Sequence, residues 1–457
     1  MIFSYISGSM AQASQRFITF ALGKDDNDEL NRIFSTAVHL HVMLAVIVVL
    51  LGETIGLWYV CNVAVIPPSR FNAAMWVYQC SIIVACATIV AVPYNALIIA
   101  HEKMSAFAYF SIIEAFVKLG IVFALMLSPI DKLILYAILM AALSIVMRVA
   151  YGIYAAKEFP ESEVRNKPDK ESLKVMGSYA GWSLWGSLAA AGYTQGLNLL
   201  LNFFFNPAVN AARGVAVTVQ AVIRNFSNNF QVAVNPQITK SYASSDFHYL
   251  HKLICRSSVF SFFLFFIIAL PVFLEIDTLL KLWLVEVPQY SASFIRIMLC
   301  ISAVELIATP LNVAIQSTGK IRGFEVSTSL ILLAIVPLSY IGLKIYHDPN
   351  VVFFVYLFQV VLAMGVRVWI AKRKIGLPVS LYLRTTVLRI ITVASISVII
   401  PVCLHIFLYP GFLRLIIVSF GCITFTPGIV FLLGLDKSEQ CLVIEKIKSL
   451  RKKIHHT

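Results

Sequence analysis

Charged residues are scarce in this sequence. They make up 13% of 457 residues, hydrophobic residues make up 59%, and the mean hydropathy is +0.84. A water-soluble globular protein carries about a quarter charged residues, so this composition excludes that class. Apolar runs of about 20 residues recur along the chain, which is the length an α-helix needs to cross a bilayer, whereas a membrane barrel would show short alternating strands. We therefore predict an all-α polytopic membrane protein.

Paired cysteines and the common catalytic motifs are also missing. The eight cysteines are scattered singly, without a Cys-x-x-Cys motif, so they indicate neither a disulfide framework nor a metal site. There is no P-loop, G-x-S-x-G, H-E-x-x-H or glycine-rich dinucleotide motif, and no soluble domain to hold one. We expect no enzyme activity, no cofactor and no metal. The first residues lack a basic n-region, so no cleavable signal peptide is expected.

The net charge is +13, and its placement argues against nucleic acid as a partner. Lysine and arginine cluster in alternate loops and in the terminal RKKIHH, while the intervening loops contain few of them. This alternation is the positive-inside pattern of membrane proteins. We expect the basic loops and the C-terminus to be cytoplasmic.

Hydropathy and loops together predict about 13 transmembrane helices. We place them at 1–22, 33–60, 71–100, 104–128, 132–156, 173–204, 208–240, 253–274, 290–316, 324–345, 350–371, 380–408 and 412–434.

The most polar internal loop divides the chain into a part with five spans and a longer remainder, and we divide the remainder into a six-helix lobe, pseudo-symmetric to the first part, and a C-terminal helix pair. The predicted parts are an N-terminal lobe of five spans (1–157), a cytoplasmic linker (158–172), a C-terminal six-helix lobe (173–371), the extra pair (380–434) and a basic amphipathic tail (435–457). An internal echo supports the two lobes. Gln15, Thr19, Arg32, Glu53 and Trp58 recur in order as Gln237, Ser241, Lys252, Glu275 and Trp283. Two parallel repeats of this kind occur in transporters. We expect Glu53 and Glu275 to be solvated at the outer helix ends.

A ladder of polar residues runs along the segment 208–240. Arg213, Gln220, Arg224, Asn228, Gln231 and Asn235 follow helical spacing, so they lie on one face over roughly 33 Å, about the thickness of the bilayer core. An arginine that faced lipid would cost at least about 2.5 kcal/mol, so the ladder should face protein or water.

Two other spans carry compatible polar faces, with Gln12 and Arg16 on the first and Gln195, Asn198 and Asn202 on the sixth. Three such helices can enclose a hydrophilic path. Further charges within spans are Glu114, Lys118, Arg148, Arg296, Glu305 and Arg367, and the excess of arginine over acid predicts a cationic path. Amides and arginines also serve as hydrogen-bonding contacts between membrane helices, and this reading stays open for each single residue.

Several stretches together resemble the Wzx-type polysaccharide flippases of the multidrug/oligosaccharidyl-lipid/polysaccharide (MOP) exporter superfamily, which is MATE-like. They are SGSMAQASQRFITFALGK, LLGETIGLWYV, VPYNALIIAHEKMSAFAYFSIIE, DKLILYA and NAARGVAVTVQAVIRNFSNNFQVAVNPQITKSYA. Such proteins usually have fourteen helices, and the match begins partway through the second, so the first helix is expected to be lacking.

The resemblance implies a flippase of the bacterial inner membrane that moves an undecaprenyl-pyrophosphate-linked oligosaccharide to the periplasmic leaflet by alternating access through a cationic cavity, for O-antigen or capsule biosynthesis. By that resemblance Arg16, Arg213 and Arg224 would bind pyrophosphate, and Gln12, Gln195, Asn198, Gln220, Asn228, Gln231 and Asn235 would line the sugar path. Other implied partners are membrane lipids, a coupling H⁺ or Na⁺, and a polysaccharide polymerase.

Two alternatives remain for the function. The first is a MATE-like cation-coupled small-molecule antiporter, which for cationic substrates should favour acidic cavity residues. The second is a truncated copy that does not transport.

Overall fold

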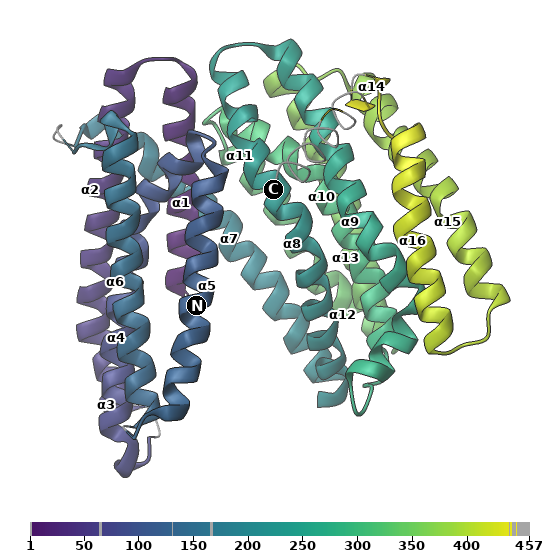
Figure 1. Cartoon of the computed structure of the whole chain (residues 1–457), viewed down its shortest axis with the longest axis horizontal. Coiled ribbons are helices and arrows are strands. Elements are labelled where there is room, and N and C mark those ends of the chain that lie inside the picture. Colours follow the sequence, from purple (N-terminus) through teal and green to yellow (C-terminus); the bar gives the residue numbers. More distant parts are fainter. Residues whose placement is uncertain are drawn as a thin grey trace, which may run out of the picture. The chain divides into compact units, whose positions relative to one another are not determined.

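The computed structural model describes residues 2–63, 66–129, 131–164, 168–437, 439, 440 and 445, with side chains from residue 7 onward. All regular structure in these residues is helical (Figure 1). The first part of the chain forms α1 (Ile2–Gly23), α2 (Asn27–Leu51), α3 (Leu57–Asn62), α4 (Phe71–Ala100), α5 (Met104–Leu127), α6 (Lys132–Glu158) and α7 (Lys170–Phe204). The second part forms α8 (Pro207–Ala243), α9 (Phe247–Trp283), α10 (Ser291–Ser317), α11 (Arg322–Leu333), α12 (Ile335–Tyr346), α13 (Asn350–Ile375), α14 (Val379–Tyr382), α15 (Arg389–Phe407) and α16 (Phe412–Leu433). Short π or 3-10 segments lie at Gly52–Gly56, Pro68–Arg70, Pro160–Ser162 and Leu383–Leu388.

The helices confirm the predicted class of an all-α polytopic membrane protein, because each of the thirteen predicted spans coincides with a long helical segment. Among the described residues, ten of these segments are long and apolar enough to cross a bilayer. The other three are α1, α7 and α8. With 35 and 37 residues, α7 and α8 are long enough, so their polar content sets them apart. These are the three helices in which the sequence predicted polar faces.

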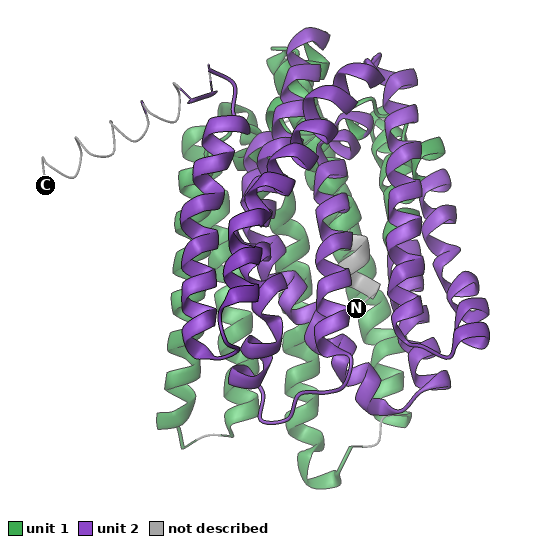
Figure 2. Ribbon diagram, turned by 90° about the vertical axis from the view of Figure 1, so that its right-hand side faces the viewer, with its two compact units in different colours: residues 1–188, 235–246, 316–325 green, residues 189–234, 247–315, 326–457 purple. Residues whose placement is uncertain are grey.

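The chain divides into two compact units, which Figure 2 colours separately. Unit 1 comprises Met1–Leu188, Asn235–Asp246 and Gln316–Glu325, and unit 2 comprises Ala189–Val234, Phe247–Ile315 and Val326–Thr457. Unit 1 therefore includes the last turns of α8 and the segment after α10. The lobe boundaries inferred from the sequence were drawn from loop polarity and stay a prediction. Most of the predicted tail, 435–457, lies outside the described residues.

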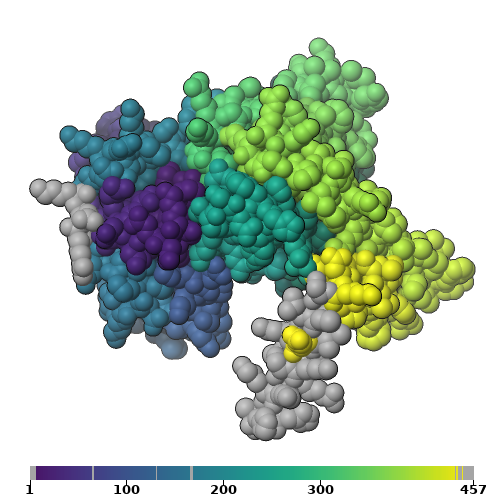
Figure 3. All heavy atoms as spheres, turned by 90° about the horizontal axis from the view of Figure 1, so that it is seen from above, coloured from purple at the N-terminus to yellow at the C-terminus, as the bar shows by residue number. Residues whose placement is uncertain are grey.

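Each unit has its own apolar core. In unit 1, Phe34, Leu97 and Met176 are among the fully buried side chains. In unit 2, Phe294 of α10 and Phe353 of α13 meet with ring centroids 4.2 Å apart. The terminal helices α15 and α16 pack together and against α9, and Figure 3 shows the atoms of this pair side by side in yellow-green and yellow.

The internal echo has a counterpart in local geometry. Asp25 between α1 and α2 and Ser245 between α8 and α9 both adopt a left-handed conformation, with φ of 59° and 60°. Glu102 after α4 and Gly319 after α10 do the same, with φ of 59° and 76°. A non-glycine residue at positive φ is uncommon, so matching turns at matching places indicate a repeated helix-turn-helix unit.

The expectation for Glu275 is wrong. Glu53 is exposed, as expected. Glu275 is 0% exposed, lies at a non-helical residue inside α9, and is bound by His405 of α15 and Arg414 of α16. The helices α15 and α16 bury Glu275 at this point of α9. The sequence around Glu275 cannot predict this packing with distant helices.

Candidate functional site

A groove between α7 and α8 in unit 2 brings several predicted residues together. Its volume is about 580 Å³, and it is lined by Gln195, Asn198, Leu199, Asn202, Asn210, Arg213, Gly214 and Val217. Ligand sites in proteins commonly have volumes of about 300–1,000 Å³. Five of these side chains are amides or arginine, so the groove offers both hydrogen-bond donors and acceptors.

Arg213 is the charged group of this groove and is only 7% exposed. Its Nη1 donates to Oδ1 of Asn198, and its Nη2 donates to the carbonyl oxygen of Thr194 at 3.1 Å. Asn198 in turn donates to Oε1 of Gln195 at 3.0 Å. Within the described residues no carboxylate forms an ion pair with Arg213, so neutral dipoles stabilise the guanidinium without cancelling its charge.

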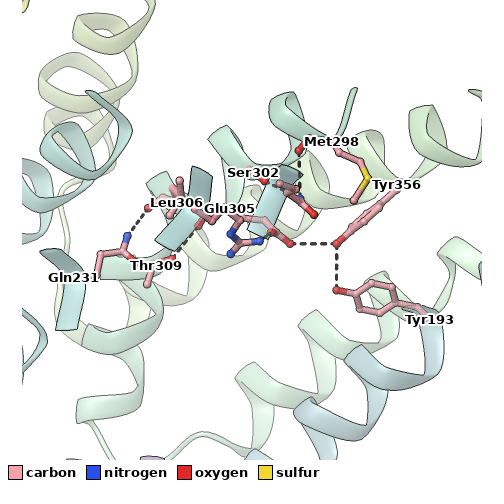
Figure 4. Close-up of polar contacts among 10 residues, drawn as sticks. Tyr193, Gln231, Met298, Ser302, Glu305, Leu306, Thr309 and Tyr356 are labelled. Carbon is pink, nitrogen blue, oxygen red and sulfur yellow. Dashed lines mark hydrogen bonds and ion pairs between the residues drawn. The ribbon is translucent and has the colours of Figure 1, made fainter. Parts of the chain in front are cut away.

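Farther along α8, the polar ladder contacts α10. The amide of Gln220 donates to the carbonyl oxygen of Met298 at 3.3 Å and to the hydroxyl of Ser302 at 2.6 Å. Gln231 is 4% exposed and donates to the carbonyl oxygen of Leu306 at 3.2 Å (Figure 4). These two amides connect helices, which is the alternative that the sequence left open.

Arg224, between these amides, forms an ion pair with Glu305 of α10. The two side chains are 29% and 17% exposed. The other carboxylate oxygen of Glu305 accepts a hydrogen bond from Tyr356 of α13 at 3.4 Å, and the Tyr356 hydroxyl lies 3.3 Å from that of Tyr193 on α7 (Figure 4). The charge of Arg224 is therefore balanced, unlike that of Arg213.

The last two ladder residues lie apart from these contacts. Asn228 is half-buried, and its side chain makes no hydrogen bond to any described residue. Asn235 belongs to unit 1, where its backbone carbonyl accepts from Thr239 at 3.3 Å.

The predicted residues of α1 lie in unit 1. Arg16 donates from Nη2 to the carbonyl oxygen of Ser317 at 2.6 Å, and its guanidinium lies 4.5 Å from the ring centroids of both Phe17 and Phe20. Gln12 donates to Gln316 at 3.1 Å and accepts from Ser183 at 2.5 Å. Ser317 is the last residue of α10, so Arg16 places a positive charge at the negative end of that helix.

A polar cluster holds the end of α8 within unit 1. Lys240 forms an ion pair with Glu102 at 2.8 Å, and Gln237 donates to the other oxygen of the carboxylate at 3.0 Å. Partial burial alone would raise the pKa of Glu102. The hydrogen bonds from Lys240 and Gln237 and the charge of Lys240 outweigh burial, so this pKa lies below its ordinary value of 4.5.

Sequence reasoning missed some members of these clusters. Asn210 precedes Arg213 by one helical turn, so the spacing of the ladder could have revealed it. Tyr193 and Tyr356 look like ordinary apolar residues of their helices, and only the packing brings their hydroxyls to Glu305. No group of three His, Cys, Asp or Glu residues suited to a metal ion occurs within the described part of the chain.

No protein-family model matches this chain, and no curated protein matches it significantly. Solved structures do match. "Crystal structure of MATE in the bent conformation" has a TM-score of 0.70 and 13% identity, covering 84% of this chain and 86% of that one. "MATE transporter ClbM in complex with Rb+" has a TM-score of 0.70 and 16% identity, covering 80% and 83%. A MOP superfamily transporter from Pyrococcus furiosus, described as having a binding pocket of reverse polarity that suggests a different function, has a TM-score of 0.68 and 12% identity, covering 84% and 86%. The chain therefore has the fold of the MATE transporters of the MOP superfamily.

Proposed function

We propose that this protein is an exporter of the bacterial inner membrane that moves an anionic lipid-linked oligosaccharide, of the undecaprenyl-pyrophosphate class, between the leaflets. The product would serve surface polysaccharide biosynthesis. One observation carries the proposal. Arg213, buried and without a carboxylate partner in the described residues, stands in an amide-lined groove of a membrane-spanning bundle.

The chemistry of the groove fits both parts of such a substrate. An arginine keeps its charge at every relevant pH, and its planar fork can bind two phosphate oxygens at once. Amide side chains supply both donors and acceptors for sugar hydroxyls. We therefore assign Arg213 to the pyrophosphate and Gln195 and Asn198 to the sugar. Arg16 and Arg224 remain candidate pyrophosphate ligands, each of which would have to exchange its present protein partner.

A MATE-like antiporter of small cationic molecules is the second candidate, favoured by the fold and by the Rb⁺ complex of one structural neighbour. The charge of Arg213 disfavours a cationic substrate in this groove, because like charges repel at close range. The reversed pocket polarity described for the Pyrococcus furiosus transporter offers a precedent for a different function within the same fold.

Reconstitution into liposomes tests the proposal. The substrate is undecaprenyl-pyrophosphate-linked N-acetylglucosamine, and a membrane-impermeant lectin detects its appearance in the opposite leaflet. We expect flipping by the wild-type protein and a loss of about 10- to 100-fold in Arg213→Ala, because charge-assisted hydrogen bonds are worth about 1.5–3 kcal/mol.

The matched control is Thr218→Ala on the exposed surface of the same helix, where the hydroxyl bonds only the carbonyl oxygen of Gly214 at 3.0 Å. It should flip normally. If liposomes that contain the wild-type protein do not flip the glycolipid but transport the cationic dye ethidium, the proposed flippase function is refuted and the antiporter is favoured.

A further inference from the structure

Arg224 and Glu305 form a charged contact between α8 and α10, whereas the neighbouring contacts between these two helices are made by neutral groups. The flanking amides of α8, Gln220 and Gln231, bind a hydroxyl and backbone carbonyls of α10. Arg224 alone binds a carboxylate there. Membrane helices can be joined by neutral hydrogen bonds at low cost, whereas a carboxylate and a guanidinium must both be stripped of water. The helix contact itself therefore does not require this pair.

The position of Arg224 relates it to the groove residue Arg213. Eleven residues separate them, which is close to three helical turns, so they lie on the same face of α8 about 16 Å apart. Their surroundings differ in one respect. Arg213 is held by an amide oxygen and a backbone carbonyl, while Arg224 is held by a full negative charge.

The groups around Glu305 come from three helices. Arg224 lies on α8, Tyr356 on α13 binds the free carboxylate oxygen, and Tyr193 on α7 lies behind Tyr356. Within the described residues, Glu305 is thus the one carboxylate that these contacts join to Arg224 and the two tyrosines.

We propose that Glu305 is an internal competitor for the anionic ligand at Arg224, so that binding of a phosphate-type anion there is coupled to uptake of a proton by Glu305. The coupling rests on the proposed function, because it makes Arg224 a second anion site along α8.

The exchange gives Arg224 a new anionic partner and leaves no charge on the one that it loses. The ion pair between Arg224 and Glu305 opens, the anion takes the guanidinium, and a proton from solution neutralises the released carboxylate. Without that proton, the anion and Glu305 would carry like charges on either side of one arginine, which is unfavourable at low dielectric. The hydroxyl of Tyr356 remains within reach of the neutral carboxyl group, so its polar atoms keep a partner.

A purely structural pair makes the opposite predictions. Replacement of Glu305 by its neutral isostere would then weaken the packing of α8 on α10 and bring no gain in anion binding. Competition predicts that the same replacement frees Arg224 and tightens the binding of anions.

Calorimetric titration of the purified full-length protein tests the proposal. The probe is methanedisulfonate, an analogue of pyrophosphate whose charge stays constant between pH 5 and pH 8, so any linked proton belongs to the protein. Titrations of the wild-type protein in two buffers of different ionisation enthalpy measure the protons taken up. We expect wild-type affinity to rise as pH falls, with proton uptake approaching one per anion.

The variants identify the group that takes up the proton. Glu305→Gln should bind the probe about tenfold more tightly at pH 7.5 and without pH dependence, because the competing charge is gone. Adding Arg224→Gln to this variant should remove the gain. Absence of proton uptake by the wild-type protein overturns the coupling even if a variant fails to fold, and so does a Glu305→Gln protein with wild-type affinity.

Arg213→Ala separates this inference from the proposed function. If it weakens binding at every pH and leaves proton uptake in place, both proposals gain support. If it binds the probe like the wild-type protein while Glu305→Gln still tightens binding, the groove assignment fails and the competition at Arg224 stands.

Discussion

Replacing Glu275 by glutamine should destabilise the attachment of the terminal helices to α9. The carboxylate is 0% exposed and accepts from Nδ1 of His405 at 2.7 Å. The Nε of Arg414 lies 3.0 Å from one of its oxygens and 3.2 Å from the other. Arg414 is only 11% exposed, so glutamine would leave a buried guanidinium without a counter-charge.

The size of the effect follows from the burial. Removing one partner of a buried ion pair costs about 3–5 kcal/mol, and we expect the lower end because glutamine can still hydrogen-bond His405. The double variant Glu275→Gln/Arg414→Met should recover most of this loss, since no orphan charge remains. The matched control is Arg70→Ala, which removes an exposed pair with Asp131, and should change stability by about 1 kcal/mol or less.

Heat inactivation in detergent is the suitable assay, with the surviving fraction measured by size-exclusion chromatography. Large membrane proteins unfold irreversibly, so half-lives at one temperature are compared rather than equilibrium free energies. Hydrogen exchange of α15 and α16 locates the loosened region. A Glu275→Gln protein as durable as the wild type, or a double variant less stable than both single variants, would refute the reasoning.

Three further predictions concern other contacts. Gly23→Ala should destabilise unit 1 in the same heat-inactivation assay, because the new Cβ would lie 2.8 Å from the backbone Cα of Lys240. The control is Gly8→Ala on the same helix, whose new Cβ meets nothing within 4 Å and which should be neutral or mildly stabilising. The ion pair of Glu102 with Lys240 should stabilise the protein at neutral pH and lose its effect as pH falls below 4.5, because folding lowers the pKa of Glu102. The difference in melting temperature between the wild-type protein and Glu102→Gln should therefore vanish in acid. Gln231→Leu should cost about 1–3 kcal/mol through the unpaired carbonyl of α10, as a shorter half-life on heating would report.

Hydropathy and spacing were sufficient to predict the helices and the polar face of α8. Apolar length is a local property, and the period of a helix fixes which residues share a face. Neither property says what that face meets. Gln220 and Arg213 belong to one stripe, yet Gln220 binds α10 and Arg213 lines a groove beside α7. Only the packing of distant segments separates the two outcomes.

The same limit explains the error at Glu275. Glu53 and Glu275 occupy matching places in the internal echo, and both fall at irregular points in their helices. Their environments differ because α15 and α16 pack on α9 and supply His405 and Arg414. The helices α15 and α16 lie outside the repeated segments. The repeat therefore predicts similar backbone geometry at Glu53 and Glu275, but it cannot predict that only Glu275 is buried.

Under the two proposals, the two arginines of α8 form two anion sites of different strength along one helix. Dipoles around Arg213 stabilise its charge without cancelling it, so an anion that bound there would gain nearly the full Coulomb attraction. At Arg224 the same anion must first displace Glu305. The affinity for the anion is therefore lower at Arg224 than at Arg213 at neutral pH. It rises at Arg224 when Glu305 is protonated. A transporter needs an anion site that binds and also releases, and a carboxylate that competes for one arginine supplies the release without altering the other.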